Sequence, residues 1–190
     1  MHLFAKTSGA FATVAAPLMV LIALLSRDVL GATASAEEIQ LAVVYRLAKF
    51  VTWPASQAHG GHTGFTLCID DRNTFEVARR RLQGRSIREQ TLRFTLIDPA
   101  SPLPHCDLLY ITERRINRAS DLLDQVKGLP VLTVGDSPEF TKYGGIVQLL
   151  NRDKRIRMQI NVEAARRVEL DFSSQLLSLA ELVDDQGSRL

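Results

Sequence analysis

The sequence predicts an α/β fold with a mostly parallel sheet, on three observations. Short apolar runs of strand length alternate with segments of helical periodicity over residues 37–134, which is the order of βαβ units. The segment "DLLYI" at 107–111 is apolar almost throughout, as in a strand that helices cover on both faces. With 190 residues and 46% apolar content, the chain can build a proper core in one or at most two domains.

The first expected element of the folded part is a helix over 37–51, which ends before Trp53 and Pro54. Apolar residues lie on more than one side of it, so we expect it to pack on two surfaces. Either both surfaces belong to this chain's own sheet and C-terminal helix, or one is a subunit or partner interface. The apolar stripe comprises Ile39, Ala42, Val43, Leu47 and Phe50, with Leu41, Val44 and Tyr45 on other sides.

The remaining elements follow in order and then change character. We expect strands at 65–69, 92–97, 107–111 and 130–134, and helices at 74–82 and 119–126. Segments 146–150 and 155–160 flank "NRDK", which predicts a C-terminal hairpin. Asn161 is expected to cap a helix through Val168, and Ser173 or Ser174 a helix through Leu182.

The N-terminal 36 residues have the pattern of a secretory signal. Lys6 precedes an apolar stretch over 10–25, and the small residues before Glu37 fit an A-x-A cleavage site after Ala36. A retained signal anchor is the alternative, but the stretch contains a threonine and a proline and is short for a span of about 20 residues. We therefore expect a signal peptide over 1–36 and one exported domain over 37–190, with no membrane span after cleavage.

Charge and cysteine content narrow the function classes. The chain has 23 basic and 21 acidic residues, scattered along its length, which disfavours binding to nucleic acid or a membrane by bulk charge. The run Arg79 to Arg81 is typical of a solvated helix face, with an acidic partner as the alternative, and no stacking aromatics accompany it. Cys68 and Cys106 are the only cysteines, and an even pair in an exported protein favours a disulfide. If their strands are parallel and in register, the sulfurs lie about 10 Å apart, so the bridge requires offset strands.

The sequence contains no recognisable catalytic, metal or cofactor motif. His59 and His62 lie in a Gly-rich turn without a nearby carboxylate or cysteine, which disfavours zinc, and no nucleophile has an activating neighbour. Asp70 and Asp136 each follow a strand, and ligands of open α/β sheets bind at the carboxyl ends of strands. A solvated turn is the alternative for both aspartates.

The loop before the hairpin raises the question of phosphate binding. Gly144 and Gly145 lack the spacing of a phosphate loop and lead into a strand instead of a helix N-terminus. Positive φ or close backbone approach explains these glycines better. We expect the neighbouring aromatics Phe140 and Tyr143 to pack over the edge of the sheet.

An ordered set of segments across the whole mature chain resembles the YfiR family of periplasmic proteins. The segments are "YRLAKFVTWP", "FTLCI", "GRSI", "CDLLYI", "LPVLTVGDSPEFTKYGGIVQLL", "KRIRMQINVEAARR" and "SSQLLSLAELV". The resemblance implies a Rossmann-like layered fold, export to the periplasm, a homodimer and a regulatory role without enzymatic activity. It matches Cys68 and Cys106 to one cysteine pair of the family, whereas Gln148 and Asn151 occupy the region of a second pair found in some members.

The family role that this resemblance implies is repression. The periplasmic protein binds the sensor domain of an inner-membrane diguanylate cyclase and lowers cyclic di-GMP and biofilm formation, and an outer-membrane lipoprotein can sequester it. A small-molecule binding protein and an unrecognised periplasmic enzyme are the alternatives, and Trp53 is also well placed for the core. Candidate partner or ligand contacts are Tyr45, Trp53, Asp70, Asp136, Phe140 and Glu163.

Overall fold

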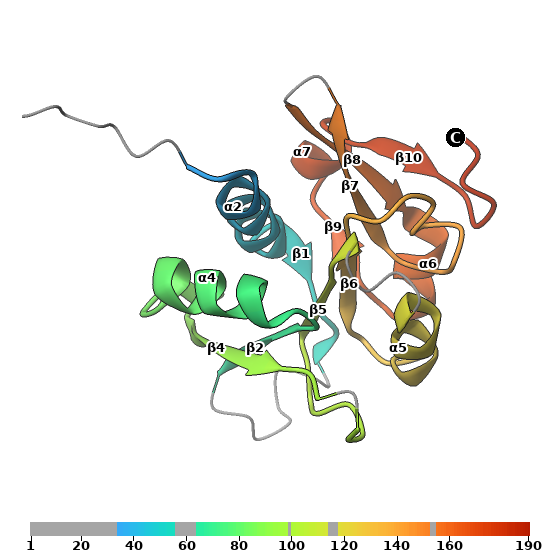
Figure 1. Cartoon of the computed structure of the whole chain (residues 1–190). Coiled ribbons are helices and arrows are strands. Elements are labelled where there is room, and N and C mark those ends of the chain that lie inside the picture. Colours follow the sequence, from blue (N-terminus) through green and yellow to red (C-terminus); the bar gives the residue numbers. More distant parts are fainter. Residues whose placement is uncertain (1–33, 56–63, 99, 114–117, 153–154) are drawn as a thin grey trace, which may run out of the picture. The chain divides into compact units, whose positions relative to one another are not determined.

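An eight-stranded sheet runs through the part of the chain that the computed structural model describes, residues 34–55, 64–98, 100–113, 118–152 and 155–190 (Figure 1). Across the sheet lie β10 (Glu181–Val183), β8 (Arg155–Asn161), β7 (Val147–Arg152), β6 (Leu132–Gly135), β5 (Leu108–Ile111), β2 (Phe65–Ile69), β4 (Gln90–Leu96) and β3 (Ser86–Ile87). Neighbouring strands from β7 to β4 are parallel, as are β8 and β10, whereas β7–β8 and β3–β4 are antiparallel. The expected α/β fold with a mostly parallel sheet and a C-terminal hairpin is confirmed.

The chain reverses its direction across the sheet after β4. From β2 it passes through α4 (Arg72–Leu82) to β4 on one side, then returns to β5 on the other side of β2 and continues to β6. Such a switch point leaves a crevice outside the carboxyl ends of the two strands where the direction reverses, here β2 and β5. Open α/β sheets bind ligands in such crevices.

Helices cover both faces of the central strands. α2 (Ala36–Ala48) and α4 share one buried cluster with Leu108 and Tyr110, while α5 (Ala119–Gln125) shares another with Leu109 and Ile111. Side chains alternate along a strand, so β5 contributes to both clusters and all four of its residues are buried. The strand buried on both faces is therefore confirmed.

Four helices begin after a side chain that accepts a backbone N–H group of the first helical turn. Asn161 caps α6 (Val162–Arg167) and Ser173 caps α7 (Ser174–Leu177), as expected. Asp71 caps α4, which therefore starts two residues earlier than predicted, and Ser35 caps α2. Cleavage after Ala36 stays a prediction, and it would remove the Ser35 cap, which typically contributes about 1 kcal/mol.

Two elements differ from the prediction because strand pairing overrides local helical preference. The helix expected over 37–51 ends at Ala48, and β1 (Val51–Thr52) pairs antiparallel with β9 (Asp171–Phe172). The last helix, expected through Leu182, ends at Leu177, and β10 pairs in parallel with β8. Both short strands satisfy backbone groups of segments distant in sequence, which helical periodicity cannot reveal.

The apolar stripe read from the sequence coincides with the buried side of α2 at Leu47, and its Val43 is partly buried against the same core, but its other residues are exposed. Leu41, Val44, Leu47 and Ala48 are buried. Ile39 is 47% exposed and Phe50 is 39% exposed. We call Ile39 and Ala42, together with Phe50 just beyond the end of the helix, the outer face of α2. One of the two expected packing surfaces is thus this chain's own core, and the other is open among the described residues.

Cys68 and Cys106 form a disulfide, with their Cα atoms 5.8 Å apart. The register aligns Cys68 with Leu109, three residues beyond Cys106. A straight strand would separate the two cysteines by about 10 Å, so the chain before Leu108 leaves the strand direction and returns beside β2. The bridge, which joins the cluster under α5, is confirmed.

The loop between β6 and β7 closes around Phe140, whose side chain is fully buried. A Cβ atom at Gly135 would lie 2.5 Å from the ring of Phe140, and one at Gly145 would lie 2.2 Å from it. Gly144 has φ of +92°. Gly145 thus gives space for the ring and Gly144 gives a left-handed backbone. Tyr143, like Phe140, was expected to pack over the edge of the sheet, but it is 56% exposed because the turn directs it to the surface.

Candidate functional site

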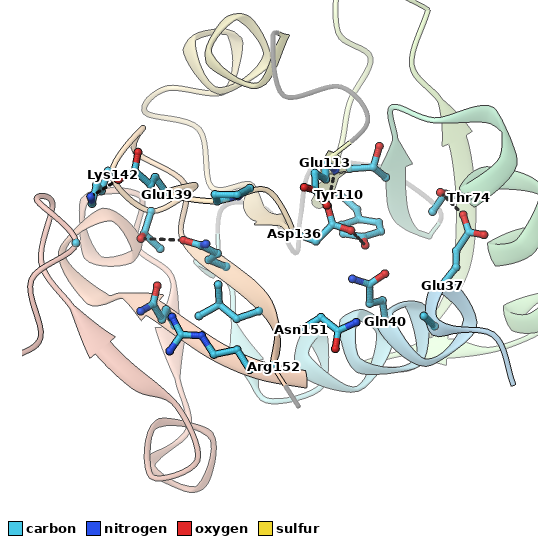
Figure 2. A pocket seen from close by; sticks show the side chains of 18 of the residues that line it. Glu37, Gln40, Thr74, Tyr110, Glu113, Asp136, Glu139, Lys142, Asn151 and Arg152 are labelled. Carbon is cyan, nitrogen blue, oxygen red and sulfur yellow. Dashed lines mark hydrogen bonds and ion pairs between the residues drawn. The ribbon is translucent and has the colours of Figure 1, made fainter. Parts of the chain in front are cut away.

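A polar cleft of about 820 Å³ lies at the carboxyl edge of the sheet (Figure 2). Its walls come from the start of α2 and from the residues around the carboxyl ends of β5, β6 and β7. Figure 2 shows Glu37, Glu113 and Asp136 on one side of it and Lys142 and Arg152 on the other. We call this space the carboxyl-edge cleft.

Two aspartates hold the chain that leaves β5 from both sides. The backbone N–H of Thr112 donates to Asp70 Oδ1 at 3.0 Å, and the N–H of Glu113 donates to Asp136 Oδ1. The hydroxyl of Tyr110 donates to Asp136 Oδ2 at 3.0 Å. Because β5 lies between β2 and β6, the carboxylates that follow those strands clamp consecutive amides after β5. Asp70 and Asp136 therefore both have a positional role at this edge.

Burial shapes the electrostatics of the clamp. It raises the pKa of Asp70 to about 6, against the lowering effect of the Thr112 amide and hydroxyl. Asp70 Oδ2 and Thr112 Oγ1 are buried without a hydrogen bond of regular geometry among the described residues. Burial also raises the pKa of Asp136, against the Tyr110 hydroxyl that donates to it, and raises the pKa of Tyr110.

The raised pKa of Asp70 predicts a stability that falls as pH rises through the window between about 4 and 6. In that window the folded protein holds a proton that the unfolded chain has lost, so ionisation favours unfolding. We expect the wild type to gain about 2 kcal/mol of unfolding free energy, relative to Asp70→Asn, between pH 7 and pH 4.5. Urea unfolding of both proteins at the two pH values measures this difference.

Asp98→Asn is the control of opposite sign. Hydrogen bonds from the Ala100 amide and the Ser101 hydroxyl lower the pKa of the exposed Asp98 carboxyl. Its ionised form therefore favours the folded state, and this contribution is lost on acidification. If the unfolding free energies of the wild type and Asp70→Asn changed in parallel with pH, the burial of the Asp70 carboxylate would be contradicted.

Most of the contact candidates lie away from the cleft. Trp53 is 9% exposed, donates to the Asp107 carbonyl at 3.3 Å and packs edge-on against Phe65. The partly buried Tyr45 donates to the Ser86 carbonyl at 3.1 Å. Of the six candidates, Asp136 lines the cleft, whereas Tyr45, Trp53, Asp70, Phe140 and Glu163 do not. Contact of these residues with a partner or ligand stays a prediction.

The sequence analysis missed several side chains of the cleft. Thr112 and Glu113 directly follow the β5 strand, and the rule that selected Asp70 and Asp136 selects them too. Glu37, whose carboxylate accepts from the Thr74 hydroxyl, had no comparable signal, because α2 comes to the cleft only through tertiary packing.

The lining residues limit the chemistry that the cleft offers. They supply carboxylates, amides, hydroxyls and two cations, with no histidine or cysteine. No group of three or more metal-ligating side chains occurs in the described parts of the chain. The described histidine, His105, lies 3.6 Å from Asp107 at the opposite edge of the sheet, and His59 and His62 lie outside the described residues. The arrangement suits a polar ligand better than nucleophilic catalysis.

The region of the second cysteine pair carries polar residues of β7 instead. Gln148 is 2% exposed and accepts a hydrogen bond from the Thr141 hydroxyl, while Asn151 is exposed further along the strand. Both residues line the cleft. Among the described residues, no cysteine is free.

Fold and site together define a Rossmann-like α/β domain with a polar cleft at the carboxyl edge of its sheet. The YfiR/HmsC-like family matches residues 37–181, more than half of the chain, and the protein therefore belongs to this family. The resemblance seen in the sequence is thus confirmed. No curated protein matches the chain. In the described ranges, no helix is long and apolar enough to cross a bilayer.

Proposed function

We propose that the protein is a periplasmic regulator that represses an inner-membrane diguanylate cyclase by binding the cyclase's periplasmic sensor domain. Membership of the YfiR/HmsC-like family over residues 37–181 is the observation that carries the proposal. A signal peptide over 1–36 delivers the chain, a homodimer is the working form, and an outer-membrane lipoprotein removes the regulator from the cyclase. Repression lowers cyclic di-GMP and biofilm formation.

The outer face of α2 supports binding by occupancy. Ile39 and Phe50 are large apolar side chains that the described chain leaves 47% and 39% exposed. Apolar and aromatic groups of this kind supply much of the affinity at protein interfaces. Trp53, the stronger anchor by residue type, packs in the core, and we therefore assign the contact to the exposed Ile39 and Phe50 instead.

Repression by occupancy needs a difference in affinity between two states of the cyclase. Moving a two-state equilibrium from 1:99 to 99:1 requires about 5.5 kcal/mol of differential binding. Interface anchors contribute about 2 kcal/mol or more each, so a few residues of the outer face are sufficient. No covalent chemistry is required.

We expect Ile39→Asp with Phe50→Ser to abolish repression without unfolding the protein. Substitutions at exposed positions usually change stability by less than about 0.5 kcal/mol, whereas each lost anchor weakens binding about 30-fold. The measurement is cellular cyclic di-GMP in a deletion strain restored with the variant, which should stay at the level of the deletion.

Leu129→Asp is the matched control for this variant. Leu129 is 50% exposed in the turn after α5, so the substitution has the same chemistry at another surface. We expect it to restore repression at equal periplasmic abundance. Full repression by the α2 variant would remove the outer face of α2 as the contact.

The carboxyl-edge cleft favours a second candidate function, a periplasmic small-molecule binding protein. Its volume of about 820 Å³ and its polar lining accommodate a small polar molecule, to which Arg152 offers a cation, whereas Lys142 is paired with Glu139. A ligand retained through purification, or a thermal shift with nucleotides or amino acids, supports this function. The two functions are compatible, because a ligand of the cleft can regulate the repressor.

A further inference from the structure

The small total charge of the chain hides a strong local asymmetry. Residues 72–93 contain seven arginines and two glutamates, a net charge of +5, and no lysine. The rest of the chain from Glu37 carries 14 basic and 18 acidic residues, a net charge of −4. The segment forms α4, β3 and the start of β4, and β3 is the last strand of the sheet on that side. We call it the arginine-rich edge (green in Figure 1).

All seven arginines are exposed. Glu76 pairs with Arg79 at 3.1 Å, and Glu38 on α2 pairs with Arg81 at 2.6 Å. The guanidinium groups with no ion-pair partner among the described residues are those of Arg72, Arg80, Arg85 and Arg88. The positive field of this edge is therefore not neutralised by the chain itself.

The side chains of this edge select the kind of partner. Arginine forks bind phosphate and carboxylate oxygens in a bidentate manner. A protein partner would be expected to meet apolar or aromatic anchors, but the large exposed apolar residues of the described chain all lie outside 72–93. Residues 72–93 carry no exposed aromatic ring that could stack on nucleic acid bases. A charge-only surface instead fits the headgroup layer of an anionic bilayer.

We propose that the arginine-rich edge docks on the surface of a phospholipid bilayer that contains anionic lipids. The guanidinium groups lie at the level of the phosphates, and no side chain enters the hydrocarbon. Such docking concentrates the protein on the membrane, which raises its encounter rate with any membrane-embedded partner. The inference goes beyond the proposed function and does not depend on it, because it involves lipid alone.

The test is co-sedimentation of protein purified from the periplasm with vesicles at 50 mM and 500 mM salt. Vesicles of phosphatidylcholine with about 30 mol per cent of the anionic lipid phosphatidylglycerol are compared with vesicles of pure phosphatidylcholine. We expect binding to the anionic vesicles alone, and loss of it at high salt. Arg80→Gln with Arg85→Gln and Arg88→Gln should weaken binding about 100-fold, at about fivefold for each charge.

Arg155→Gln with Arg157→Gln and Arg166→Gln is the matched control. These three arginines are also exposed, and the variant has the same net charge as the test variant. Circular dichroism verifies that both variants are folded. Equal weakening by both variants would show that net charge alone is responsible, and absence of wild-type binding at low salt would overturn the proposal.

The experiment also separates the bilayer from a protein partner. If the wild type does not bind anionic vesicles but binds the cyclase's purified periplasmic domain through these arginines, the arginine-rich edge is a protein interface and the lipid proposal is wrong. Because the vesicles contain no cyclase, the lipid proposal can fail while the proposed repression holds, and the reverse is equally possible.

Discussion

Replacing Cys68 and Cys106 together by alanine should lower the free energy of unfolding by about 4 kcal/mol. The disulfide joins residues 38 apart in sequence, and a loop of that length restricts the unfolded chain by about this amount in the chain-entropy model. Small domains are stable by only about 5 to 15 kcal/mol, so the loss is a large fraction of the total. Urea unfolding of the oxidised wild type and the double variant measures it.

Reductant supplies the control for the disulfide. We expect dithiothreitol to bring the wild type close to the stability of Cys68→Ala with Cys106→Ala, and to leave that variant unchanged. Both sulfurs lie in the buried cluster under α5, so the two reduced proteins differ only in side chains of similar size. Mass spectrometry of unreduced protein with two free thiols would contradict the bridge.

The second large effect is expected at Gly145. A Cβ atom there lies 2.2 Å from the Phe140 ring, and Gly135 blocks the other side of the ring at 2.5 Å. The ring cannot retreat, so Gly145→Ala should destabilise the protein by about 3 kcal/mol, the upper part of the usual range for overpacking. Thermal or urea unfolding provides the measurement.

Gly128→Ala separates crowding from backbone strain. Gly128 has φ of +76° and open space around its Cβ position, so alanine should cost only about 1 kcal/mol there. In a Phe140→Leu background, Gly145→Ala should cost less than in the wild type, because the smaller side chain can move away. Additive losses at Phe140 and Gly145 would show that the two positions do not interact.

Elements that are determined by neighbouring residues in the sequence could be predicted, whereas elements that depend on contacts with distant segments could not. The strand at Phe65–Ile69 has the predicted bounds, because a short apolar run and a following aspartate define it within the chain. β10 was missed because its backbone is satisfied by β8, about 20 residues earlier in sequence. Most of the buried side of α2 was missed because apolar residues lie all around that helix, and only the surrounding core selects Leu41 and Val44 over Ile39.

The candidate site follows the same division. The position of Asp70 and Asp136 after parallel strands was readable from the sequence, since strand ends of one sheet share an edge. Their common task, the clamp on the amides of Thr112 and Glu113, depends on the strand order that puts β5 between β2 and β6. Strand order is a property of the whole fold, and the alternation of elements does not determine it.

The measurement that tests the central claim most directly is cellular cyclic di-GMP in a strain that lacks the gene. The account predicts a rise on deletion that an exported wild-type copy reverses. The same cyclic di-GMP level with and without the gene, under conditions where the protein is made, would contradict repression and favour the ligand-binding function of the cleft.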